Sequence, residues 1–294
     1  MDTKRLYSPK QVREVLDRHG FYFSKGLGQN FLIDGNTVRK IVYLAGITKE
    51  DCVIEIGPGM GTLTEELAIN AKKVISIELD NRLKPILEET LAPYDNTKII
   101  FEDVLKVDLR ELIKTECEGL NVKVVANLPY YVTTPIIAKL IESELPIQSI
   151  SVMVQKEVAQ RIVAKAHTKE YGSLSLFVQF YTEPEILMKV PKTVFMPKPT
   201  IDSAVINLKL REKLPEADKG NYFYLVRAAF SKRRKTIINA LSSYGLDIEK
   251  EELREALKRA NIEETLRGED LTMEDYVRLS LEVKELKKAS NEKN

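Results

Sequence analysis

The chain has 294 residues, of which 44% are hydrophobic and 30% are charged, and its formal net charge is +1. This balance is typical of folded proteins and does not favour a disordered chain, while the length favours about two domains. The sequence has no apolar run of the roughly 20 residues that a membrane-spanning helix requires, and its first residues lack the apolar core of a secretion signal. We therefore expect a cytoplasmic protein that does not associate with membranes.

Residues 1–50 are predicted to form helical pieces around a loop at 25–32. An alternating pattern of strands and helices follows, which is typical of a parallel, doubly wound α/β sheet. The expected strands are 52–56, 74–77, 99–101, 122–126 and 150–154, and the expected helices are 62–70, 82–90 and 135–143.

The pattern changes after residue 156. Residues 174–181 and 204–210 are expected to be strands that pair antiparallel at one side of the sheet, joined through a proline-rich loop. The polar segment 211–220 is the best candidate for a domain boundary, and everything from residue 222 onward has helical periodicity. The sequence thus predicts an α/β domain over residues 1–212 and a small all-helical domain over 213–294.

Cysteine and histidine are scarce. Cys52, Cys117, His19 and His167 are the only such residues and have no metal-ligand spacing, so we expect no metal site. Cys52 opens an apolar run and Cys117 stands between two glutamates, which favours a buried and a surface residue over a disulfide. Nucleophilic catalysis by histidine is equally disfavoured.

A glycine-rich turn lies between the first expected strand of the sheet and its helix. Gly57, Gly59 and Gly61 have GxGxG spacing, with Glu55 two residues upstream. Such glycines let a backbone turn tightly and approach a ligand. Thr62 stands where a dinucleotide fingerprint requires its third glycine, so the spacing better fits a nucleoside that carries an amino-acid tail. The alternative is a tight turn with no ligand.

Two acids follow the next expected strands. Glu78 ends one strand, where a carboxylate can accept hydrogen bonds from ribose hydroxyls, and Asp103 follows another, where it can accept from an adenine amino group. Each alone is equally well explained as a solvated carboxylate. Because the carboxyl ends of parallel strands open on one crevice, the pair favours a pocket for an adenosine-bearing cofactor.

The segment 127–130 follows the fourth strand and has the sequence Asn-Leu-Pro-Tyr. The N6 amine of adenine is a poor nucleophile because its lone pair is delocalised into the ring. The side-chain oxygen of Asn127 and the carbonyl of Leu128 can hold both N–H groups, so that the lone pair points at a methyl donor. Tyr130 offers a face for a flipped base. A purely structural turn is the alternative.

One stretch is strongly basic. Between residues 222 and 241 the charged side chains are all basic: Arg227, Lys232, Arg233, Arg234 and Lys235. A local basic surface on a nearly neutral protein favours a polyanionic partner, with a solvated helix face as the alternative.

Four ordered motifs together resemble the rRNA adenine N6-dimethyltransferases. They lie at residues 28–32, 55–64, 127–130 and 195–205, the last with Ile201 in place of the usual valine. The segment 230–236, followed by Asn239, is similar to the C-terminal signature of that family's KsgA-type branch. This branch dimethylates two adjacent adenosines near the 3′ end of 16S (small-subunit) rRNA.

The resemblance implies a Rossmann-like methyltransferase domain, S-adenosylmethionine as methyl donor, no metal, and a C-terminal domain that contacts RNA. Asn127 and Leu128 would orient the target amine, and Tyr130 and Phe195 would sandwich its base. No general base is needed, because nitrogen loses its proton easily once methylated. The implied cofactor contacts are Gln29, Asn30, Leu32, Gly57, Gly59, Gly61, Glu78, Asp103 and Asn127.

The implied partners are small-subunit rRNA and the immature small ribosomal subunit, and we expect the protein to be a monomer. Three alternatives remain. One is the antibiotic-resistance branch, which modifies large-subunit rRNA. A second is a binding protein without catalysis, like the related mitochondrial transcription factors. The third is a nicotinamide-dependent dehydrogenase, which Thr62 and the lack of a suitable histidine disfavour.

Overall fold

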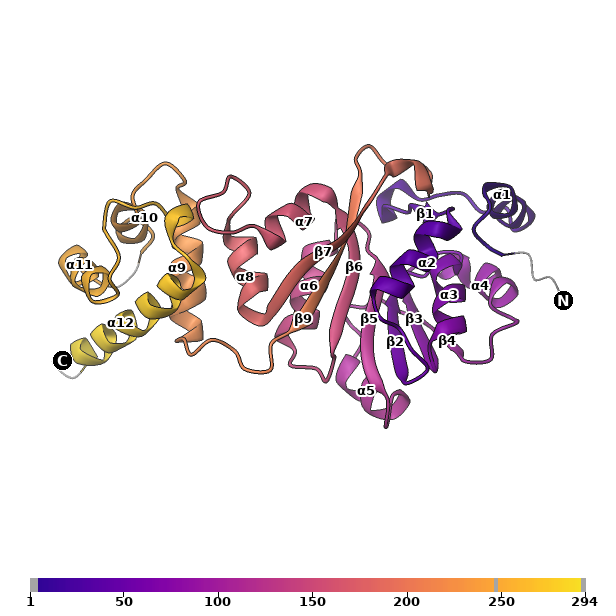
Figure 1. Cartoon of the computed structure of the whole chain (residues 1–294), viewed down its shortest axis with the longest axis horizontal. Helices are drawn as coiled ribbons and strands as arrows, with labels where there is room; N and C mark the ends of the chain where they lie inside the picture. Colours follow the sequence, from indigo (N-terminus) through magenta and orange to yellow (C-terminus); the bar gives the residue numbers. More distant parts are fainter. Residues whose placement is uncertain (1–4, 246–247, 292–294) are drawn as a thin grey trace. The chain divides into compact units, whose positions relative to one another are not determined.

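The computed structural model describes residues 5–245 and 248–291, and it divides into two compact units (Figure 1). The first comprises Met1–Ala159 and Glu183–Leu210, and the second comprises Gln160–Thr182 and Arg211–Asn294. The sequence-based division kept residues 160–182 with the first domain, whereas their contacts group them with the C-terminal residues. The assignment of methyl transfer to residues 1–212 and of RNA contact to residues 213–294 stays a prediction.

The first unit is built on a seven-stranded sheet whose strands run in the order β4-β3-β2-β5-β6-β9-β7. The five strands from β4 to β6 are parallel, and β9 pairs antiparallel with β6. This confirms the predicted doubly wound α/β sheet. The strands are β2 (Asp51–Ile56), β3 (Lys73–Glu78), β4 (Thr97–Phe101), β5 (Asn121–Asn127), β6 (Ser149–Gln155), β7 (Thr182–Val190) and β9 (Ser203–Leu210).

The central strand β2 is buried at every position, as expected for a parallel strand covered on both faces. Helices α2 and α3 pack on one face through Val38, Ile41, Leu63 and Leu67. A second apolar cluster joins α1 to α4. The helices of this unit are α1 (Pro9–Arg18), α2 (Gly35–Leu44), α3 (Thr62–Asn70), α4 (Lys84–Thr90), α5 (Leu109–Glu116) and α6 (Thr133–Glu142), with the short η1 (Lys25–Leu27), η2 (Asn81–Leu83) and η3 (Lys192–Val194).

A separate two-stranded sheet joins distant parts of the first unit. Strand β1 (Phe31–Leu32) pairs antiparallel with β8 (Phe195–Met196), so that Leu32 lies opposite Phe195. Both side chains are buried in the cluster that also holds α2 and α3. The loop before β1 is thereby fixed beside the carboxyl ends of the parallel strands.

In its described residues the second unit is built from helices, apart from Thr182, the first residue of β7. Its core is aromatic: the rings of Phe180 and Tyr222 lie 4.6 Å apart, and Tyr276 is fully buried beside them. The helices that follow residue 211 confirm the predicted helical C-terminal part. The helices are α8 (Ser173–Tyr181), α9 (Lys219–Ser231), α10 (Ile237–Ser242), α11 (Lys250–Arg259), α12 (Met273–Asn291) and the short η4 (Gly268–Asp270), with α7 (Lys156–Val163) at the division between the units.

Two expectations were wrong. Residues 174–181 form helix α8 rather than a strand. Their alternating apolar residues suit a strand, but the helix is buried around most of its circumference, so its apolar residues do not mark one face.

The second wrong expectation concerns the cysteines. Cys52 and Cys117 form a disulfide with their Cα atoms 5.6 Å apart. Cys117 is buried, because it ends amphipathic α5 on the side that faces β2.

Among the described residues, none of the helices combines the length and apolar character needed to cross a membrane.

Candidate active site

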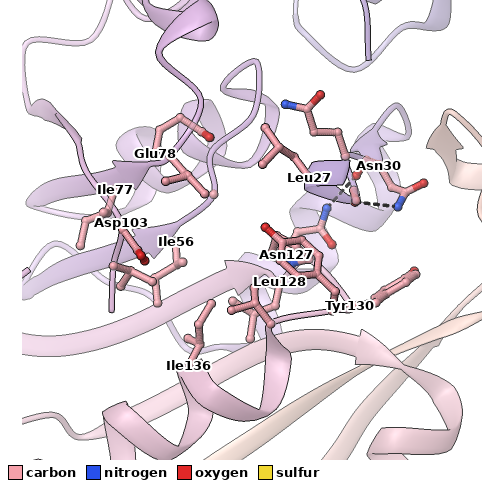
Figure 2. Close-up of a pocket in the computed structure, with 18 of the residues that line it drawn as sticks. Leu27, Asn30, Ile56, Ile77, Glu78, Asp103, Asn127, Leu128, Tyr130 and Ile136 are labelled. Carbon is pink, nitrogen blue, oxygen red and sulfur yellow. Dashed lines mark hydrogen bonds between the residues drawn. The ribbon is translucent and has the colours of Figure 1, made fainter. Parts of the chain in front are cut away.

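A pocket of about 320 Å³ opens at the carboxyl ends of β2, β3, β4 and β5 (Figure 2). It brings together most of the residues predicted to contact the cofactor or the target base, which come from five separate segments of the chain. Those that line it are Gln29, Asn30, Gly57, Glu78, Asp103, Asn127, Leu128 and Tyr130. Its volume falls within the range of small-molecule sites, which is roughly 300–1,000 Å³.

Glu78 is the most buried acid of the pocket, with 7% of its surface exposed. Its Oε1 accepts a hydrogen bond from the backbone N–H of Asp80 (2.9 Å), and its Oε2 accepts one from the N–H of Gly59 (3.2 Å). Burial raises the pKa of Glu78 to about 6. The carboxylate is therefore held in one orientation and remains able to accept from hydroxyl groups of a ligand.

The glycine-rich turn after β2 packs closely beside this carboxylate. Gly57 has a φ of +71° and lines the pocket. A Cβ on Gly59 would lie 2.9 Å from the ring of Phe31, so only glycine fits there. Gly61 has a φ of +92° and is the N-cap residue that precedes α3. Gly59, Gly61 and Leu32 are not among the lining residues, and their direct contact with a cofactor stays a prediction.

Asp103 follows β4 across the pocket from the loop that carries Asn30 (Figure 2). Its Oδ1 accepts a hydrogen bond from the N–H of Leu105 (2.9 Å), which fixes the turn. The apolar side chains of Ile56 and Ile77 line the pocket between the acids. This part of the pocket therefore offers apolar side chains to the faces of a planar ring and a carboxylate to an amino group at its edge.

The side-chain amide of Asn127 is held by the loop before β1. Its Nδ2 donates to the carbonyl oxygen of Asn30 (2.9 Å), while the Nδ2 of Asn30 donates to the carbonyl of Gly28 (3.0 Å). Because the donor end of the Asn127 amide is engaged, its Oδ1 is the end that is presented as an acceptor. The N–H of Leu128 donates to Met153 in the adjacent strand (3.2 Å), which fixes the peptide that follows.

Tyr130 and Phe195 occupy different environments. The hydroxyl of Tyr130 lies 2.7 Å from Oγ of Ser203, so the ring is anchored while it lines the pocket. Burial raises the pKa of Tyr130, which keeps this hydroxyl neutral. Phe195 is 3% exposed, belongs to the core and is not among the lining residues. Its stacking on a base stays a prediction.

Sequence reasoning missed several pocket residues. Leu79, Leu105 and Tyr131 line the pocket with 49%, 38% and 58% of their surfaces exposed. Their positions in the sequence could have indicated this, because each lies one to four residues beyond the end of β3, β4 or β5, where the predicted site residues also lie. Among the described residues, no group of three or more His, Cys, Asp or Glu side chains is arranged to hold a metal ion.

The basic run lies in the second unit. Arg227 is on α9, and Lys232, Arg233, Arg234 and Lys235 form the turn between α9 and α10. All five are exposed. The turn is tied to the loop after α7, because Nη2 of Arg233 donates to the carbonyl oxygen of Lys169 (3.0 Å).

The parallel sheet and its polar strand ends define a Rossmann-like methyltransferase. The chain belongs to the ribosomal RNA adenine dimethylase family, whose model matches residues 20–285. It is 52% identical to the ribosomal RNA small subunit methyltransferase A of Alkaliphilus metalliredigens (strain QYMF), over 95% of this chain and 98% of that one. The protein of the same name from Geobacillus sp. (strain WCH70) is also 52% identical, over 95% and 97%.

Two solved structures support the same assignment. A dimethyladenosine transferase from Plasmodium falciparum is 26% identical, with a TM-score of 0.73 over 87% of this chain and 98% of that one. The 23S rRNA methyltransferase ErmE is also 26% identical, with a TM-score of 0.66 over 87% and 100%. The Rossmann-like fold and the rRNA methyltransferase class predicted from the sequence are thus confirmed.

Proposed function

We propose that the protein uses S-adenosylmethionine to dimethylate the N6 amines of two adjacent adenosines near the 3′ end of small-subunit rRNA. Its substrate is the immature small ribosomal subunit, and it acts in the cytoplasm as a monomer with no metal cofactor. Membership of the adenine dimethylase family supports the reaction. The names of relatives that are about 52% identical support the small subunit as target.

The observation that carries the proposal is the oriented amide of Asn127. Its Nδ2 is bound to Asn30, so its Oδ1 accepts one N–H of the target amine, and the carbonyl of Leu128 accepts the other. Holding both N–H groups turns the nitrogen lone pair toward the donor. Most of the rate enhancement then comes from positioning, and no histidine base is required.

S-adenosylmethionine, which supplies a methyl group on an electrophilic sulfonium, is the proposed occupant of the pocket. Glu78 would accept from the ribose hydroxyls, and Asp103 would accept from the adenine amino group. The glycine at position 59, where a Cβ would lie 2.9 Å from Phe31, keeps the turn next to Glu78 compact. Gln29, Asn30 and Gly57 would surround the remaining part of the molecule.

The target base must leave its stack to reach this pocket. Tyr130 presents an anchored ring on which the base would stack. Phe195 would contribute the opposite face only after its side chain leaves the core. The exposed basic residues Arg227 and Lys232–Lys235 would bind phosphates, and most of the RNA affinity would therefore depend on salt.

The alternatives are less well supported. The large-subunit enzyme ErmE is 26% identical to this chain, against 52% for the small-subunit relatives. A binding protein without catalysis would have no need for an amide that is oriented at a lined pocket. Thr62 opens α3 where a dinucleotide fingerprint would place a glycine, which disfavours a dehydrogenase.

The proposal is tested with labelled S-adenosylmethionine and unmethylated small or large subunits, followed by nuclease mapping of the label. We expect dimethyladenosine in small-subunit rRNA only. Label in the large subunit would move the protein to the resistance branch. Binding of the subunit without transfer would identify an assembly factor instead of an enzyme, and an Asn127→Ala variant that still matures ribosomes normally would favour the same conclusion.

A further inference from the structure

Asp80 is a buried acid that the proposed chemistry does not use. It lies two residues beyond Glu78, at the start of η2, and only 6% of its surface is exposed. Burying a carboxylate costs free energy unless hydrogen bonds and opposite charge compensate it. The contacts of Asp80 therefore have to compensate for the cost of burying its carboxylate.

Four hydrogen bonds converge on its two carboxylate oxygens. Oδ1 accepts from the backbone N–H (3.1 Å) and the Nε (2.9 Å) of Arg82. Oδ2 accepts from the Nη2 of Arg82 (2.6 Å) and from the Nε2 of Gln29 (2.7 Å). The hydrogen bonds from Arg82 hold the pKa of this carboxyl below its usual value.

Both hydrogen-bond partners of Asp80 involve the segment 21–31, which lines one side of the pocket through its last residues. Gln29 belongs to this segment, and Arg82 contacts it. The Oε1 of Gln29 accepts from the N–H of Ser24 (2.8 Å), so that its amide is engaged at both ends. The guanidinium of Arg82 lies over the ring of Phe21, 5.2 Å from its centre, and Nη1 donates to the carbonyl of Tyr22 (3.4 Å).

Asp80 also contacts the pocket through its backbone. Its own N–H donates to the Oε1 of Glu78, the carboxylate that lines the pocket. Asp80 thus joins the strand end that carries Glu78 to the segment that carries Gln29, which lies 51 positions before Asp80 in the chain.

We propose that Asp80 is a positioning residue for cofactor binding, which fixes the segment 21–31 over the pocket and holds Glu78 in its accepting orientation. This inference rests on the proposed function. A simple capping role at η2 would need only the bond to the N–H of Arg82, and would leave the bond to Gln29 without a purpose.

The test compares Asp80→Asn with a matched control, Asp108→Asn. Asp108 caps α5 through the N–H groups of Arg110 and Glu111, but it is exposed and does not line the pocket. Titration calorimetry with S-adenosylmethionine should show about tenfold or greater weakening in Asp80→Asn, because the variant loses charge-assisted hydrogen bonds that hold the segment 21–31. Asp108→Asn should bind as the wild type does.

Two further readouts separate positioning from structural damage. S-adenosylhomocysteine should protect the amides of 22–30 from hydrogen exchange in the wild type, and much less in Asp80→Asn. The losses from Gln29→Ala and Asp80→Asn should be less than additive in the double variant, because both changes break the same contact, although Gln29 also lines the pocket.

Unchanged affinity and protection in Asp80→Asn, or fully additive losses with Gln29→Ala, would overturn the inference while the proposed function stands. A wild-type protein that binds no S-adenosylmethionine would overturn the proposed function, and this inference with it. A KM for the cofactor that rises while kcat at saturating cofactor stays within about twofold would support positioning.

Discussion

The side-chain amide of Asn127 donates to the backbone carbonyl of Asn30 at 2.9 Å, joining two residues that are 97 positions apart. The contact links the end of β5 to the loop before β1, so the acceptor oxygen of Asn127 is presented to the pocket only when that loop is in place. The orientation of this amide is therefore a property of the folded domain.

We predict that Asn127→Asp lowers methyl transfer at least about a hundredfold, because the carboxylate cannot donate to Asn30 and the target amine loses its orientation. Single-turnover transfer to small-subunit rRNA measures this. Asn96→Asp is the matched control, since the Asn96 amide also donates to backbone carbonyls but lies outside the pocket. Equal loss of transfer in both variants would argue against a specific role.

Cofactor affinity should fall below pH 6. Burial raises the pKa of Glu78 to about 6, and only the ionised carboxylate accepts from two ribose hydroxyls. Protonation at pH 5 should weaken binding about tenfold relative to pH 7.5. In Glu78→Gln, binding is expected to be weak at both pH values. A titration that finds the same affinity for the wild type at pH 5 and pH 7.5 contradicts this role.

Glu55 should limit stability at high pH. It is fully buried, its Oε2 accepts from Thr64 and Ser76, and among the described residues its Oε1 has no hydrogen-bond partner. Burial raises its pKa to about 7, so the folded state binds more protons than the unfolded state, and stability falls as the pH rises from about 4.5 to 7. The loss attributable to this group is about 3 kcal/mol.

Urea unfolding of wild type and Glu55→Gln at pH 5 and pH 8 measures this effect. The variant should gain stability relative to the wild type on going from pH 5 to pH 8, because glutamine does not ionise. A constant difference between the two proteins across this range would show that Glu55 is not the responsible group.

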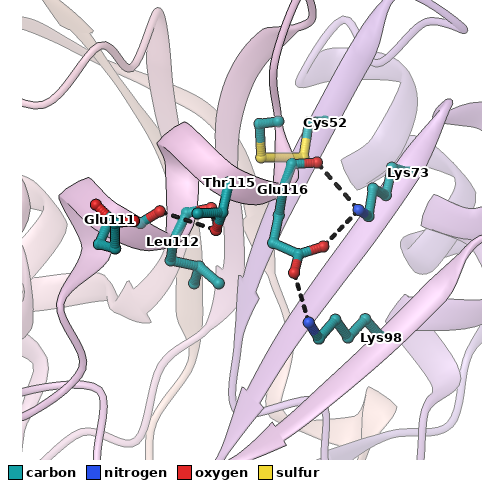
Figure 3. The surroundings of a disulfide bond; sticks show 8 residues. Cys52, Lys73, Lys98, Glu111, Leu112, Thr115 and Glu116 are labelled. Atoms are coloured by element: carbon teal, nitrogen blue, oxygen red, sulfur yellow. Dashed lines mark hydrogen bonds and ion pairs between the residues drawn. A yellow bond between two sulfur atoms is a disulfide. The ribbon is translucent and has the colours of Figure 1, made fainter.

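The disulfide should contribute to the stability of the first unit. It joins Cys52 of β2 to Cys117 at the end of α5, where Glu116 also pairs with Lys73 and Lys98 (Figure 3). A sequence separation of 65 residues corresponds to about 4 kcal/mol in the chain-entropy model. Cys117→Ser, or reduction of the wild type, should therefore lower the melting temperature. Two titratable thiols in the unfolded, unreduced protein would refute the bond.

Arg234 should contribute to RNA affinity through charge alone. Its replacement by alanine should weaken binding to small-subunit rRNA and reduce the slope of log K against log salt by roughly 0.7–0.9. Lys258→Ala, an exposed basic residue on α11, provides the control. If both variants change the slope equally, the turn between α9 and α10 has no special role.

The sheet could be predicted because parallel, buried strands leave a local signature. Each has a short apolar run, and the polar residues Glu78 and Asp103 follow directly. Their meeting in one pocket follows from the geometry of parallel strands. Helix α8 could not be distinguished from a strand, because alternation in Leu174–Tyr181 carries no information when a helix is buried nearly all round.

Contacts between distant segments were outside the reach of sequence reasoning. Nothing near Cys117 indicates that α5 ends beside β2, and nothing near Gln29 indicates that its amide binds Asp80. Such pairs depend on how whole elements pack. Motif spacing therefore located the pocket, whereas the bonds that orient its side chains required the three-dimensional structure.

Two acceptors at the end of β5 also have a consequence for the order of products. An unmethylated amine can occupy both the Oδ1 of Asn127 and the carbonyl of Leu128, but a monomethylated amine retains a single N–H. In the proposed arrangement the second transfer would proceed with one acceptor unoccupied and a methyl group beside it. The two turnovers at each adenosine are thus kinetically unequal, and the monomethyl species is the one that should accumulate when the donor runs short.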